Sequence, residues 1–152
     1  MLPLPSGEIL LSNNAVNGLG SMLIYHPDGA PVAAGKPAIA NLPVNKAGKV
    51  VLAEGGTFTI TGTLFNGISQ AASYGDDASM ATNYPIVRLE SKAGLAVWYC
   101  RTFGHSSMEV AVREVVVSTN FTVPWDVPWE DYDLRVIATG IASDPSSVTV
   151  AW

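Results

Sequence analysis

The chain has 152 residues, a formal net charge of −5, 48% hydrophobic residues and only 14% charged residues. An ordinary soluble domain is about 25% charged, so this composition argues against a highly charged cytosolic enzyme. It favours an extracellular protein or one whose surface is partly covered by neighbours. The acidic balance argues against a nucleic-acid partner, because phosphate binding needs clustered Lys and Arg. The length suits a single domain.

Three features of the sequence bear on whether the protein is exported and on the state of its one cysteine. No apolar run reaches the ~18 residues that a membrane span needs, and the opening MLPLP lacks the basic start of a signal peptide. We expect an export signal to have been removed from a longer precursor; export by another route is the alternative. Cys100 is the only cysteine, so we expect a buried small hydrophobic residue, with an intermolecular disulfide or a reactive thiol as alternatives.

Residues 1–30 are predicted to form a separate N-terminal strand segment. Residues 8–12 and 21–26 have the composition of strands and are separated by a polar turn rich in Asn and Gly. An isolated hairpin is only marginally stable in water, so we expect this segment to join a sheet of its own chain or of another molecule. The candidate assembly residues are the apolar side chains Ile9, Leu10, Leu11, Met22, Leu23, Ile24 and Tyr25.

A linker of small residues at 31–36 precedes the predicted main domain at 37–152. We expect an all-β fold, an immunoglobulin-like antiparallel β-sandwich preceded by the N-terminal hairpin or strand pair. The expected strands cover 37–42, 49–53, 57–63, 84–91, 95–103, 109–122, 132–139 and 147–151. The one expected helical turn lies at 67–74.

The central hairpin is predicted at 84–103. Its second strand alternates, so Trp98 and Cys100 should share one face while Val97 and Tyr99 share the other. In residues 57–62 we expect Phe58 and Ile60 to face the core.

Tryptophan is concentrated in the Pro-containing turn at 123–132. Trp125 and Trp129 are either plugs in the core or an exposed platform for a sugar or a protein neighbour. Trp98 and Trp152 are expected to be core or edge residues. Asn120 opens the single N-glycosylation sequence, Asn-Phe-Thr.

Several motifs in the chain resemble a known family. They are GTLFNGISQ at 62–70, YGDD at 74–77, ATNYP at 81–85, RT at 101–102, HSSM at 105–108 and VST at 117–119. Together they resemble the C-terminal sandwich domain, of the E-set type, of galactose-oxidase-like and kelch-type secreted proteins. The runs MLPLPSGEIL at 1–10 and MLIY at 22–25 look like the last strands of the β-propeller that precedes this domain.

The resemblance places His105 in a loop that supplies one copper ligand in oxidases of the galactose oxidase type. The other ligands in that family come from the propeller, and this chain has only His26 and His105. One imidazole cannot hold copper usefully, so we expect no metal and no cofactor, with His105 a loop residue. The family usually has a Pro-containing turn without tryptophans here, so Trp125 and Trp129 depart from the resemblance.

Two hypotheses follow. In the first, the chain is a non-catalytic extracellular structural module that forms a homo-oligomer or homopolymer, as a filament or surface layer, by pairing its N-terminal strands with another subunit. In the second, it is the accessory domain of a propeller oxidase, or a carbohydrate-binding module that binds glycans on Trp125 and Trp129. Neither gives catalysis to residues 1–152 alone.

Overall fold

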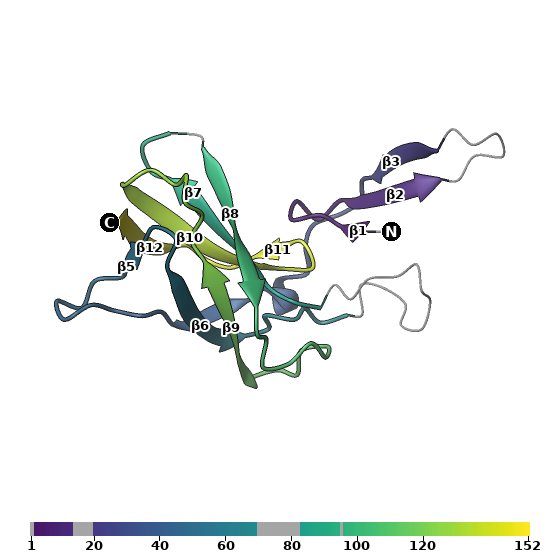
Figure 1. Cartoon of the computed structure of the whole chain (residues 1–152). Coiled ribbons are helices and arrows are strands. Elements are labelled where there is room, and N and C mark those ends of the chain that lie inside the picture. The colour runs from purple at the N-terminus through teal and green to yellow at the C-terminus, as the bar shows by residue number, and fades with distance from the viewer. Residues whose placement is uncertain (1, 14–19, 70–82, 95) are drawn as a thin grey trace.

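The structure is a computed structural model, and it describes residues 2–13, 20–69, 83–94 and 96–152. It is all-β, as predicted, and its strands form a small N-terminal sheet and a large sheet (Figure 1). The small sheet contains β1 (Leu2–Pro3), β2 (Ile9–Asn13) and β3 (Ser21–Tyr25) in the order β1-β2-β3. One 3₁₀ turn, η1 (Ala33–Gly35), follows it.

The large sheet begins after η1. It contains β4 (Ala38–Asn41), β5 (Val51–Ala53), β6 (Thr57–Thr63), β7 (Ile86–Ser91), β8 (Val97–Phe103), β9 (Val116–Thr122), β10 (Asp131–Ala138), β11 (Ile141–Ala142) and β12 (Ser146–Ala151). The strand order is β4-β6-β9-β8-β7-β10-β12-β5, with β11 paired to β10.

Strand β8 belongs to both layers of the sandwich. Its first half, Val97 to Cys100, pairs with β7, and its second half, Arg101 to Phe103, pairs with β9. The sheet therefore folds over at β8. One layer contains β4, β6 and β9, and the other contains β7, β10, β12 and β5 (Figure 1).

The core lies between these two layers. Period-2 alternation directs Ile60 and Phe121 inward from one layer, and Leu89 and Leu134 inward from the other; all four are fully buried. Phe58 packs at the edge of this core, with its ring 5.8 Å from that of Phe121. Both inward-facing predictions for the strand at 57–63 are therefore confirmed.

The central hairpin also alternates as predicted. Cys100 is buried and free, and Trp98 is half-buried with its ring against Tyr132, whereas Val97 and Tyr99 are exposed. Burial raises the pKa of the Cys100 thiol to about 12. The prediction of a buried small hydrophobic residue is confirmed.

The prediction of a strand at 109–122 was wrong for residues 109–115, because β9 begins only at Val116. The pairing strand β6 ends at Thr63, opposite Val116, and the chain then turns away at Leu64, whose φ is 61°. Among the strands that the structure describes, none pairs with residues 109–115 there. Instead the Ala111 amide donates to the Gly67 carbonyl.

Two further features differ from the sequence-based expectation. Strand β5 pairs with β12 in parallel, so the sandwich is not antiparallel throughout. Parallel neighbours need a long crossover, and here almost the whole sandwich separates β5 from β12 in the sequence. The expected linker at 31–36 contains η1, while residues 70–74 of the expected helical turn lie outside the described residues.

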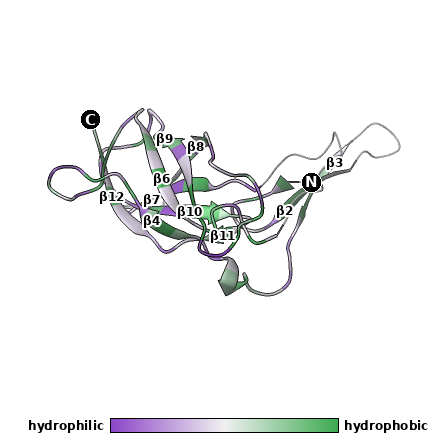
Figure 2. Cartoon of the chain, turned by 90° about the horizontal axis from the view of Figure 1, so that it is seen from below, coloured by the Kyte–Doolittle hydropathy of each residue, from purple (hydrophilic) through white to green (hydrophobic). Residues whose placement is uncertain are grey.

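The N-terminal sheet stands apart from the sandwich and touches it through turns (Figures 1 and 2). Gly7, between β1 and β2, meets Gly140, between β10 and β11: a Cβ on Gly140 would lie 2.3 Å from the Gly7 Cα. The two backbones can come this close only because both residues are glycine, which has no Cβ. Within the described ranges, no helix has the length and apolar character needed to cross a membrane.

Candidate functional site

The seven predicted assembly residues differ in exposure between the two strands that carry them. Ile9, Leu10 and Leu11 of β2 are half-buried, whereas all of β3 is exposed, and Met22 is 76% accessible. Strand β2 is paired on both sides, by β1 and β3. In the part of the chain that the structure describes, β3 pairs with β2 alone, so its other edge is open.

Both faces of β3 are apolar. Alternation directs Met22 and Ile24 to one face and Leu23 and Tyr25 to the other, and all four side chains are more than half exposed. An open edge with apolar side chains on both faces is a template for pairing with another strand.

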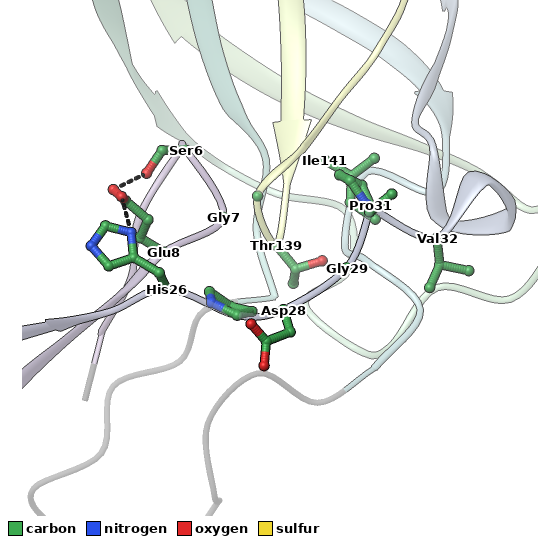
Figure 3. A pocket seen from close by; sticks show the side chains of 13 residues that line it. Ser6, Gly7, Glu8, His26, Asp28, Gly29, Pro31, Val32, Thr139 and Ile141 are labelled. Carbon is green, nitrogen blue, oxygen red and sulfur yellow. Dashed lines mark hydrogen bonds and ion pairs between the residues drawn. The ribbon is translucent and has the colours of Figure 1, made fainter.

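A cleft of about 340 Å³ lies where the N-terminal sheet meets the sandwich (Figure 3). Glu8 is one of its lining residues, and its carboxylate holds a small polar cluster together. The Ser6 hydroxyl donates to Glu8 Oε2 at 2.8 Å, and His26 Nδ1 lies 2.7 Å from Glu8 Oε1. Figure 3 shows Ser6 and His26 both directed at Glu8, with Asp28 and Thr139 farther along the cleft.

This cluster does not have the geometry of a nucleophilic triad. A triad places the imidazole between the hydroxyl and the carboxylate, so that the imidazole takes the hydroxyl proton. Here the carboxylate of Glu8 lies between Ser6 and His26. The contacts therefore fasten the ends of β2 and β3 together and do not activate Ser6.

His105 is held by its own domain. Its Nδ1 lies 2.9 Å from the Thr119 hydroxyl, and its ring stacks on Tyr84 with centroids 5.6 Å apart. Burial lowers its pKa. Among the described residues, no group of three or more His, Cys, Asp or Glu side chains is placed to hold a metal ion.

Trp125 and Trp129 are exposed, so the alternative that they plug the core was wrong. Trp125 is 75% accessible and Trp129 is 61% accessible. The Trp125 ring lies against Gly55, where an added Cβ would fall 2.2 Å from the ring. Trp129 Nε1 donates to Glu54 Oε2 at 2.6 Å. Both indoles are thus fixed by the turn between β5 and β6.

Trp152 was expected to be a core or edge residue. It follows the end of β12 and is 93% accessible, so it does not lie in the core. It lies at the same end of the sandwich as the other two exposed indoles, since the Glu54 amide donates to the Ala151 carbonyl. Three of the four tryptophans therefore lie near one turn.

Asn120 lies within β9, which pairs with β6 and β8. Its Oδ1 accepts from the Thr59 hydroxyl at 2.7 Å, and its Nδ2 approaches Gly104. Modification of Asn120 stays a prediction.

Comparison of the chain with protein-family models and with curated proteins found no match.

The sequence did not indicate that Glu54 and Gly55 support the tryptophans, nor that Glu8 joins Ser6 to His26. These partners are up to 75 residues apart, and their contact depends on how strands pair. One signal was present: residues 123–126 and 127–130 read VPWD and VPWE, a tandem repeat whose two copies place tryptophan in the same context.

Proposed function

We propose that this chain is a non-catalytic extracellular structural module that self-associates through its N-terminal strands. The observation that carries the proposal is the exposed edge of β3, which no other described strand pairs with, together with its apolar side chains. A strand of a second copy that pairs with this edge would satisfy backbone groups and cover Met22 and Ile24 at once. Head-to-tail contacts whose rotation does not close a ring repeat along an axis, and we infer that they build a filament or surface layer here.

The first prediction tests this edge. Replacing both Met22 and Ile24 by Lys puts two charges on one face of β3, and paired edges do not tolerate such charges. We expect the unmodified chain to form oligomers or polymers whose size grows with concentration, and the double variant to be a monomer. Light scattering and electron microscopy measure the difference.

The matched control is Val44→Lys, which adds a charge at an exposed apolar residue outside the N-terminal sheet. This variant should assemble like the unmodified chain. A polymer that persists after Met22→Lys/Ile24→Lys, or after deletion of residues 1–30, would contradict the proposal.

A second candidate is the C-terminal accessory domain of a galactose-oxidase-like propeller protein. The observation that favours it is that β3 is apolar on both faces, because a sheet stacked between neighbouring sheets must be covered on both sides. The resemblance to that family, and with it an immunoglobulin-like classification of the sandwich, supports this candidate. It predicts that the coding sequence upstream continues in frame into propeller repeats and that the isolated chain is monomeric; an upstream stop codon would rule it out.

A further inference from the structure

The turn at 123–130 is built from two equivalent units. In each copy of the VPW repeat the valine is buried and the tryptophan is exposed: Val123 and Val127 enter the core, and Trp125 and Trp129 face outward. Each tryptophan is followed by an acidic residue, Asp126 or Glu130. Each unit thus presents an exposed indole; the Asp126 carboxylate beside the first is exposed, whereas Glu130 beside the second is half-buried and lies close to the Tyr132 hydroxyl.

The two exposed indoles each contact the turn between β5 and β6. Proline precedes each of them and restricts the backbone. The buried Tyr132 donates its hydroxyl to the Pro128 carbonyl at 2.8 Å, while Gly55 and Glu54 fix the two rings as described above. A rigid ring loses little conformational entropy when a ligand stacks on it.

The charges around these rings limit the kind of ligand. Across residues 2–13, 20–69, 83–94 and 96–152, the ion pairs formed do not include Asp126 or Glu130. Their carboxylate oxygens are hydrogen-bond acceptors that complement hydroxyl donors. The same charges would repel a sulfated or uronate polymer.

We propose that Trp125 and Trp129, together with Asp126 and Glu130, form a binding surface for a neutral polysaccharide. Each indole stacks on the face of one sugar ring, and the neighbouring carboxylates accept hydrogen bonds from its hydroxyls. A polymer of repeating rings matches a surface of repeating indoles. This surface lies at the end of the sandwich near the C terminus, away from β1 to β3 (Figure 1), so it does not depend on the proposed assembly.

The second prediction concerns this surface. The intact chain is run through native gels that contain one polymer each: a soluble neutral glucan, mannan or xylan, or a uronate polymer. A gel without polymer is the reference. Binding of a Lys- and Arg-rich peptide is measured in a separate titration. At least one neutral polysaccharide should retard the chain and the uronate should not. Trp125→Ala and Trp129→Ala should each weaken binding about tenfold, the effect of losing one stacking contact.

The controls separate binding from folding. Trp125→Tyr keeps an aromatic face and should retain part of the affinity, and Tyr99→Ala, which removes an exposed aromatic ring from β8, should bind normally. Thermal unfolding of each variant identifies any that is misfolded.

Three outcomes would overturn the proposal. They are no retardation by any neutral polysaccharide, equal retardation of the Trp→Ala variants, and binding of the uronate polymer instead. If only the basic peptide binds, and the double variant Asp126→Asn/Glu130→Gln loses this binding, the surface belongs to a cationic partner.

Discussion

At the residue scale, two buried ionisable side chains set the response of the protein to alkaline pH. Cys100 lies in β8 facing the core, and Tyr132 is fully buried in β10. Burial raises the pKa of both groups, and nearby Glu130 adds to the effect on Tyr132. Each group keeps its proton in the folded chain at a pH where it is lost in the unfolded chain.

The third prediction follows from the sign of this difference. Above pH 9, the ordinary pKa of the thiol, the unfolded state binds fewer protons than the folded state, so the free energy of unfolding decreases as pH rises. With a folded pKa of about 12, Cys100 alone should account for about 1 kcal/mol between pH 9 and pH 10. Urea unfolding across this range measures it.

The control for this prediction is Cys100→Ala, which lacks the thiol. Its stability should fall less steeply over the same pH range, with the remaining decrease due to Tyr132 and other groups. Identical pH dependence in the two proteins would show that the thiol does not contribute.

At the element scale, β6 shows why a strand interior can require glycine. Gly62 lies between β4 and β9, and a Cβ there would fall 2.2 Å from the Ala38 carbonyl oxygen and 2.4 Å from the Phe65 ring. The buried Phe65 ring and the Ala38 backbone therefore occupy the space that a side chain at residue 62 would need.

The fourth prediction is that Gly62→Ala destabilises the sandwich by about 1–3 kcal/mol, the usual cost of overpacking. The clash must outweigh the entropy that alanine saves in the unfolded state. Chemical denaturation gives the value.

Gly94→Ala is the matched control, because a Cβ at Gly94 meets no atom within 4 Å. It should change stability by less than about 0.5 kcal/mol. Equal effects at the two positions would contradict the packing argument.

At the scale of the whole molecule, the contact of Gly7 with Gly140 joins the N-terminal sheet to the sandwich. Gly140 has a φ of 83° and its backbone touches the Gly7 turn. The cleft around Glu8 and His26 is formed along the same junction.

The fifth prediction is that Gly140→Ala loosens this junction while the sandwich core stays folded. Amide hydrogen exchange should become faster in β2 and β3 and remain slow in β7 and β10, because local opening frees one unit before the other. Mass spectrometry of exchanged peptides resolves the two regions.

Gly29→Ala is the control for backbone strain. Gly29 has a φ of 92°, but a Cβ on it meets nothing within 4 Å. Faster exchange in β2 and β3 with this variant as well would attribute the effect to strain and not to the Gly7–Gly140 contact.

Local sequence determined the strands. Alternation at 57–63 and 97–103 reflects a backbone that directs successive side chains to opposite faces, so Ile60 and Cys100 could be assigned to the core before any pairing was known. Strands at 8–12 and 21–26 were also indicated by composition and by the polar turn between them.

Only the tertiary structure decided which strands pair and which side chains meet. The parallel pairing of β5 with β12, the hydrogen bond from the Ala111 amide to the Gly67 carbonyl and the fixing of Trp129 by Glu54 all join parts of the chain far apart in sequence. Such contacts depend on strand order, which local alternation does not encode. The sequence alone therefore left Trp125 and Trp129 as either core plugs or an exposed platform, and the folded sandwich decided that they face outward on a rigid support.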